Sequence, residues 1–113
     1  MMRIFLALAL FSAAALAADI SGTWNAAVTL DAGSGTATFV LKQSGDQLTG
    51  TYSGALGEAK VTGTVKGNAV QWSFEISDAG TIRYSGAIKS PTKIEGTAEY
   101  GSVGKGTFVA DKK

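Results

Sequence analysis

The chain of 113 residues has no cysteine, no histidine and only one proline. Without cysteine it can form neither a disulfide framework nor a thiolate metal site, and without histidine it lacks the base of a nucleophile–histidine dyad. Ten Lys and Arg residues against nine Asp and Glu leave no basic excess of the kind that nucleic acid binds. We therefore expect no metal, no cofactor and no nucleic-acid partner.

The N-terminal segment has the three parts of a secretory signal peptide. Arg3 makes a positive start, an apolar run follows from Ile4 to Ala18, and Ala15-Leu16-Ala17 forms an A-x-A cleavage site. The run of about 15 residues is shorter than the ~20 that span a bilayer. The sequence therefore predicts a signal peptide at 1–17, cleaved after Ala17 or at the next residue, and a secreted or periplasmic protein.

The remaining residues, 18–113, are enough for one small domain and contain all 15 glycines. Apolar and polar residues alternate with period two, which predicts strands; between Val70 and Ile76 four apolar residues share one face. Short turn signals rich in glycine, aspartate and serine separate the runs. The pattern predicts eight strands, at 20–30, 36–44, 47–54, 58–66, 69–77, 81–89, 93–100 and 105–111.

Short connections predict that each strand pairs antiparallel with the next, because a parallel neighbour needs a crossover of a dozen or more residues. Eight such strands favour a closed up-and-down barrel, with a two-sheet sandwich as the alternative. A Gly-Thr repeat places glycine on the apolar face of successive strands, where it allows strong curvature; these glycines are at 22, 50, 63, 96 and 106. The Thr/Lys/Glu face must then meet water, which argues against insertion of the barrel into a membrane.

Three blocks carry a likeness to a known family: Ser21 to Trp24, Leu48 to Tyr52, and Val70 to Phe74 followed by Tyr84 to Gly86. Through them the chain resembles the avidin/streptavidin family of the calycin-type barrels. The resemblance implies an eight-stranded barrel with a ligand site at one open end. It assigns four aromatic residues to that site: Tyr52, Trp72, Tyr84 and Tyr100.

The polar part of the family's biotin site is matched poorly. Gly54 stands where the family has a serine, Gly106 stands where it has a late aspartate, and Asn25 is displaced by one residue, which turns its side chain to the other face. A buried polar headgroup needs its hydrogen-bond partners. Tight biotin binding is therefore not expected.

The same aromatic residues are also explained as ordinary core, and Trp24 as a plug at the base of the barrel. The resemblance to the calycins implies that a basic residue near the C-terminus, Lys105 or Lys112, covers this tryptophan. The carboxylates suggest no chemistry, since Glu95 and Glu99 share the outer face of one strand with Lys93. An acid–base pair would need a carboxyl group in an apolar environment. We expect no catalytic residues and no enzyme activity.

The leading hypothesis is a secreted, non-enzymatic binding module for a small, mostly apolar ligand in the barrel mouth. The alternative is a protein-interaction or inhibitor domain that uses its outer wall and loops around a solid core. Cavity volume discriminates between them, because a mouth of roughly 300 Å³ or more favours a ligand. The polar outer face favours a monomer or a weak dimer.

Overall fold

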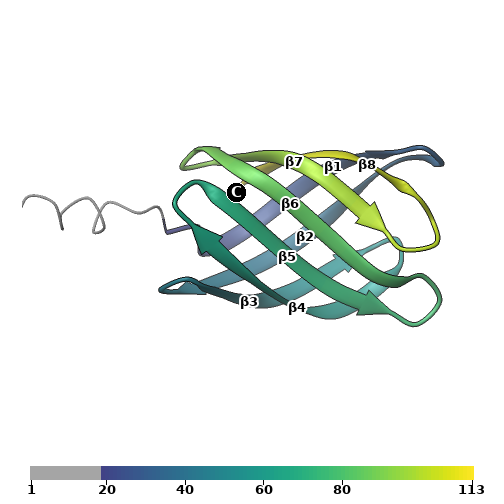
Figure 1. Cartoon of the computed structure of the whole chain (residues 1–113), viewed down its shortest axis with the longest axis horizontal. Helices are drawn as coiled ribbons and strands as arrows, with labels where there is room; N and C mark the ends of the chain where they lie inside the picture. The colour runs from purple at the N-terminus through teal and green to yellow at the C-terminus, as the bar shows by residue number, and fades with distance from the viewer. Residues whose placement is uncertain (1–18) are drawn as a thin grey trace, which may run out of the picture.

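The computed structural model describes residues 19–113, so the predicted signal peptide and its cleavage site lie outside the described residues. These residues form a closed barrel of eight antiparallel strands whose order around the barrel follows the chain (Figure 1). The strands are β1 (Gly22–Leu30), β2 (Gly33–Ser44), β3 (Gln47–Gly54), β4 (Gly57–Lys66), β5 (Ala69–Ile76), β6 (Gly80–Ser90), β7 (Lys93–Tyr100) and β8 (Lys105–Lys112). The predicted all-β up-and-down barrel is confirmed, and the sandwich is not formed.

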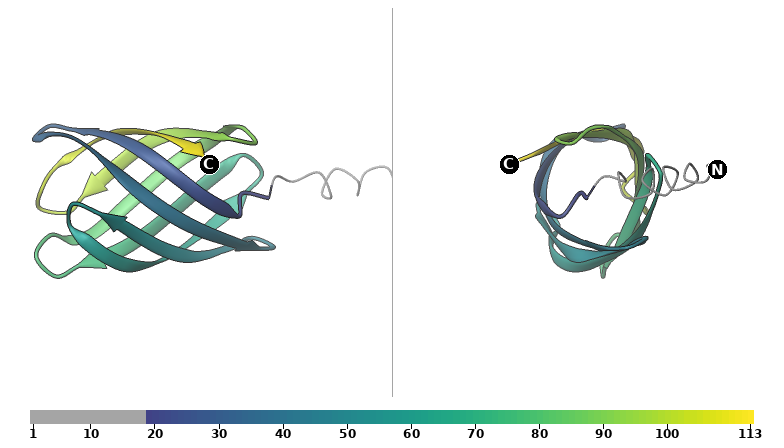
Figure 2. Two further views of the ribbon diagram at one scale, coloured as in Figure 1. Left: turned by 180° about the vertical axis from the view of Figure 1, so that it is seen from behind. Right: turned by 90° about the vertical axis from the view of Figure 1, so that its left-hand side faces the viewer.

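The first and last strands close the barrel. β1 pairs with β2 on one side and with β8 on the other, from Trp24↔Lys112 to Leu30↔Gly106. Seen end-on, the strands form a continuous ring (Figure 2). Closure pairs the edges that an open sheet would expose. No helix of residues 19–113 is long and apolar enough to cross a membrane.

Most predicted strand boundaries agree with the structure within two residues, but β2 begins three residues earlier than predicted. The predicted loop at 31–35 shrinks to a two-residue turn because Gly33, Ser34 and Gly35 pair with the end of β1. The prediction was wrong because it treated a glycine-rich stretch as a turn. Gly33, with φ at 142°, continues into the strand.

The predicted strands at 58–66 and 69–77 leave a two-residue turn at Gly67-Asn68, and this turn is confirmed because Lys66 pairs with Ala69 across it. Of the two turn residues, Gly67 has a positive φ, at 60°, and Asn68 does not. This is the first central position, which a type II′ turn reserves for glycine.

Aromatic side chains fill the interior. Phe39 is fully buried, and its ring centroid lies 4.9–5.8 Å from those of Tyr52, Trp72, Phe74 and Tyr84. Such separations are typical of packed aromatic pairs. Among the described residues, none of the buried side chains is charged. The interior of the barrel is therefore packed with aromatic side chains, which we call the solid core.

The end of the barrel near Ile20 and the C-terminus (Figure 2) is closed by Trp24. Its indole Nε1 donates a hydrogen bond to the Ile20 carbonyl oxygen at 2.9 Å, and both residues are fully buried. Lys112, not Lys105, lies beside this base: it pairs with Trp24, and its Cε would be 2.6 Å from a Cβ added to Gly22. Trp24 and Ile20 therefore block this end of the barrel.

Candidate functional site

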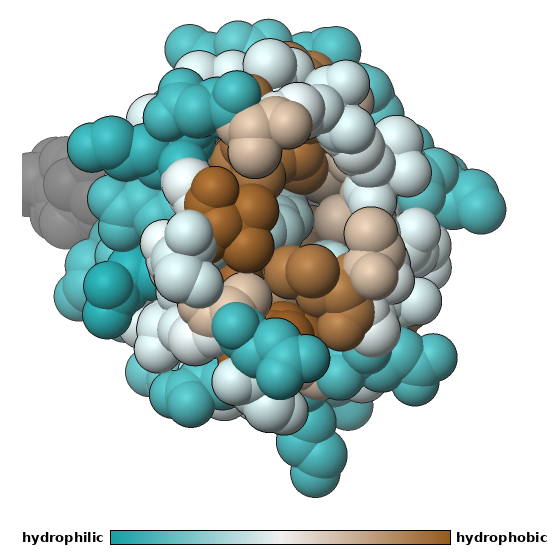
Figure 3. Space-filling model, turned by 90° about the vertical axis from the view of Figure 1, so that its right-hand side faces the viewer, coloured by the Kyte–Doolittle hydropathy of each residue, from teal (hydrophilic) through white to brown (hydrophobic). Residues whose placement is uncertain are grey.

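A shallow hollow of about 240 Å³ lies at the end of the barrel opposite Trp24. We call it the mouth; it is lined by Val28, Leu30, residues 32–36, Tyr52, Ala55, Leu56, Tyr100 and Val103. Figure 3 shows this end of the molecule, with apolar residues around a central depression and polar residues outside them. None of the lining residues is charged. The mouth therefore suits an apolar, uncharged group.

Tyr52 reaches the mouth from β3. The residue is only 2% exposed, and its hydroxyl oxygen accepts a hydrogen bond from the Leu56 backbone N–H at 3.4 Å. A Cβ added to Gly54 would lie 2.6 Å from this oxygen. The glycine that departs from the avidin pattern thus provides the space in which the Tyr52 hydroxyl lies.

A pair of hydrogen-bonded hydroxyls lies beside it, because the hydroxyls of Tyr84 on β6 and Tyr100 on β7 bond to each other. One of the two donates, so the proton of the other has no acceptor in the part of the chain that the structure describes. The Tyr52 proton also has none there. Because Tyr52 and Tyr100 line the mouth, an acceptor there can meet the Tyr52 proton and, when Tyr84 is the donor of the pair, the Tyr100 proton as well.

Burial holds both hydroxyls of this pair in the neutral form. It raises the pKa of Tyr84 far above its ordinary value, and the Tyr100 and Tyr52 hydroxyls raise that pKa further. Burial also raises the pKa of Tyr100, although its hydrogen bond to Tyr84 opposes the shift. The pair therefore stays a hydrogen-bond donor throughout the physiological pH range.

This pair predicts a loss of stability in alkali. In the unfolded chain tyrosine ionises near pH ~10, whereas the folded protein keeps Tyr84 neutral, so ionisation above that pH favours unfolding. We expect constant stability up to about pH 10 and then a fall of about 1.4 kcal/mol per pH unit from Tyr84 alone. Urea unfolding between pH 8 and ~11.5, followed by tryptophan fluorescence, measures it.

The matched control is Tyr84→Phe, which removes the largest of these ionisations. It should lower stability at neutral pH by about 1 kcal/mol through the lost hydrogen bond, and flatten the alkaline slope. An unchanged slope in this variant would contradict the assignment of the alkaline transition to Tyr84.

Trp72 lies further from the mouth than the tyrosines and does not line it. Its ring stacks on that of Tyr84, with centroids 5.4 Å apart, and it is 2% exposed. Its indole nitrogen is the one buried side-chain polar atom without a hydrogen-bond partner within residues 19–113. The four predicted site residues thus form one cluster, in which only Tyr52 and Tyr100 reach the mouth. Their role in binding remains a prediction.

The sequence analysis missed the rim of the mouth. Ala32, Leu56 and Val103 lie in the turns after β1, β3 and β7, outside the alternating pattern that marked the strands. In an up-and-down barrel every second turn lies at the same end. Apolar residues inside alternate turns were therefore the signal that could have located the rim.

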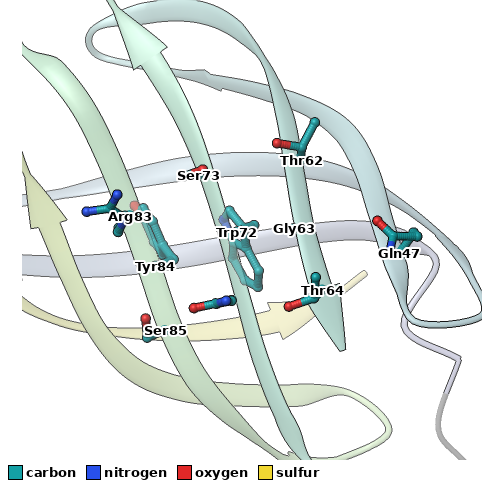
Figure 4. A pocket seen from close by; sticks show the side chains of 10 residues that line it. Gln47, Thr62, Gly63, Thr64, Trp72, Ser73, Arg83, Tyr84 and Ser85 are labelled. Carbon is teal, nitrogen blue, oxygen red and sulfur yellow. The ribbon is translucent and has the colours of Figure 1, made fainter. Parts of the chain in front are cut away.

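A second hollow, of about 300 Å³, lies over β4, β5 and β6 on the outer wall. Figure 4 shows polar side chains of its lining: Thr62, Thr64, Ser73, Arg83 and Ser85 come from these three strands, and Gln47 from β3. Two of the predicted site residues, the buried Trp72 and Tyr84, also belong to this lining. The exposed side chains that line it are polar, unlike those of the mouth. This hollow suits hydrogen bonding to a polar surface, not capture of an apolar molecule.

The charged groups lie on the outside of the barrel. Lys93 and Asp111 form an exposed ion pair at 3.0 Å on neighbouring strands, an arrangement that stabilises a protein only slightly. Among residues 19–113 no group of three acidic side chains gathers where it could hold a metal ion.

Comparisons with protein-family models, with curated proteins and with solved structures find no match for this chain. The likeness to the avidin family therefore rests on the short sequence blocks alone.

Proposed function

We propose that this chain is an exported, non-enzymatic binding module whose mouth holds a small, mostly apolar ligand. The observation that carries the proposal is the mouth itself, an uncharged apolar hollow with tyrosine hydroxyls among its lining residues. Binding pockets commonly combine such an apolar lining with a few polar groups that orient the ligand.

The solid core limits the size of this ligand. The mouth, at about 240 Å³, is smaller than the roughly 300 Å³ at which drug-sized pockets begin. The mouth is thus below the volume that would favour a ligand over an interaction domain, and the bound group must be small and stay at the end of the barrel.

The hydroxyls define the chemistry of the bound group. Tyr52 and the Tyr84–Tyr100 pair offer protons, so the ligand should carry an acceptor such as a carbonyl or ether oxygen. A carboxylate is disfavoured because no cation lines the mouth, and an unpaired buried charge is costly.

Binding can be tested by native mass spectrometry of residues 18–113 purified without refolding, followed by titration with matched probes by protein NMR. We expect cyclohexanone to bind more tightly than cyclohexane, and cyclohexanecarboxylate to bind least. Tyr52→Phe should weaken cyclohexanone binding by about 3- to 10-fold, the value of one hydrogen bond, and leave cyclohexane binding unchanged.

Two exposed valines supply the control for location. Val103, 40% exposed, lines the mouth, whereas Val40, 49% exposed, lies on the outer wall. Val103→Asp should abolish probe binding, and Val40→Asp should not change it. Equal effects of the two variants, or no binding of any probe to the wild-type chain, would exclude the mouth as a ligand site.

The solid core and the polar outer hollow favour a second candidate, a protein-interaction domain that acts through its wall and loops. It predicts an apo mass that no small molecule changes, with a protein partner that shifts amide signals of β4 to β6. On either proposal the chain is a monomer or a weak dimer.

A further inference from the structure

The strand pairing of the barrel is incomplete at one place. β4 and β5 pair over five positions, from Lys66↔Ala69 to Thr62↔Ser73. Each of the other seven neighbouring strand pairs extends over seven to nine positions. Beyond Thr62 and Ser73 both strands continue toward the mouth, but they no longer pair with each other. We call this place the seam: residues 57–61 of β4 and 74–76 of β5.

The register identifies which backbone groups the seam leaves without a partner strand. Lys66 and Ala69 close a two-residue turn as a hydrogen-bonded pair, and such pairs recur at every second position along an antiparallel ladder. The next after Thr62↔Ser73 would be Lys60↔Glu75, which does not form. The side chains of these two residues have opposite charges and are exposed, yet within residues 19–113 only Lys93 and Asp111 form an ion pair.

Two stacked aromatic rings lie on the inner side of the barrel wall at the seam. Tyr52, from β3, stacks on Phe74, from β5, with ring centroids 4.2 Å apart and planes 18° from parallel. Between their strands, β4 contributes only the small, half-buried Ala59 and the buried Val61. Because Tyr52 also lines the mouth, one side chain is shared by the seam and the candidate site.

Parting two strands requires breaking their ladder hydrogen bonds, and at the seam there are none between β4 and β5 to break. The seam is therefore the part of the wall beside the mouth that can open most easily, since local opening occurs where the fewest bonds hold the chain. Displacement of Phe74 would free one face of the Tyr52 ring and widen the mouth.

We propose that the seam is a lateral gate of the mouth: β4 and β5 part there, the Tyr52–Phe74 stack opens, and the ligand enters or leaves. This inference rests on the proposed function, because it assumes that the mouth binds a ligand. It adds that the exchange rate of the ligand is set at β4 and β5, not at the rim.

The absence of native cysteine allows a clean test by cross-linking. The variant Lys60→Cys/Glu75→Cys places two thiols across the seam, and Thr62→Cys/Ser73→Cys places two thiols across the last paired position as a matched control. Each variant is compared in its reduced and oxidised forms, and a short bifunctional thiol reagent replaces the disulfide if the seam thiols are too far apart to join. Cyclohexanone exchange is measured by NMR line shape.

We expect the cross-linked seam to slow both association and dissociation of cyclohexanone by about tenfold or more, with little change in Kd, as when a gating motion is blocked. Reduction should restore the rates, and the control cross-link should leave them unchanged. Amide hydrogen exchange at Lys60 and Glu75 should be faster than at Thr62 and Ser73 in the wild-type chain.

The outcomes separate the gate from the binding function. If cyclohexanone binds the wild-type chain and the seam cross-link leaves its rates unchanged, the gate is wrong and the mouth remains the site. If both cross-links slow exchange equally, general stiffening of the barrel explains the result and the gate is overturned. If no probe binds the wild-type chain, the proposed function fails, and the gate fails with it.

Discussion

Replacement of Gly96 by alanine should lower the free energy of unfolding by about 3 kcal/mol, because overpacking against the backbone is costly. Gly96, on β7, faces Gly86 on β6 across the sheet. A Cβ at this position would collide with the Ser85 carbonyl oxygen and lie 2.8 Å from the Ser85 carbonyl carbon. Neither atom can move without separating β6 from β7. For a domain of this size the loss corresponds to a melting temperature lower by roughly 12–24 °C.

Gly35→Ala is the matched control for Gly96→Ala. Gly35 also lies in a strand, but its φ is not positive and an added Cβ would meet no atom within 4 Å. Its replacement should change stability by less than about 0.5 kcal/mol. Thermal and urea unfolding of both variants measure the difference. Similar effects for the two would show that glycine in these strands is not required by close packing.

Phe39→Ala should destabilise the protein by about 4 kcal/mol, in the range measured for loss of a fully buried phenylalanine. Phe39 contacts the rings of Tyr52, Trp72, Phe74 and Tyr84, so its removal leaves a cavity that these large rings cannot fill without leaving their own partners. Urea unfolding followed by circular dichroism measures the loss.

Val40→Ala, at the next position of β2, is the control, because Val40 is 49% exposed. Its effect should stay below about 0.5 kcal/mol. The cavity of Phe39→Ala should also bind benzene, since engineered apolar cavities remain dry and take up such molecules. If the variant kept wild-type stability and bound nothing, the barrel interior would not be the solid aromatic core described above.

The strand count and the pairing order were predictable because their signals are local. Alternation marks each strand within four to eight residues, and turn residues mark its end. The segment from Val70 to Ile76 illustrates this, since Val70, Trp72 and Phe74 are all buried as the pattern predicted. The start of β2 was not predictable in this way, because Gly33 and Gly35 carry a turn signal while their pairing with β1 depends on the other strand.

The candidate site could be predicted only in part. Tyr52 and Tyr100 were identified from the sequence, and both line the mouth. That Tyr84 bonds to Tyr100, while Trp72 lies below them, depends on how far each strand is shifted around the barrel. Alternation assigns a side chain to a face, but not to a height along the barrel axis.

By itself, the sequence determined that the chain forms a small all-β domain with aromatic residues inside and polar residues outside. Period-two patterning and turn chemistry are properties of neighbouring residues, so they do not depend on the rest of the fold. The tertiary structure alone decided that the interior is filled, that the mouth is small, and that pairing between β4 and β5 stops at Thr62 and Ser73. These features depend on strand shift, on the volumes of facing side chains and on closure of the barrel, which bring together residues far apart in the chain.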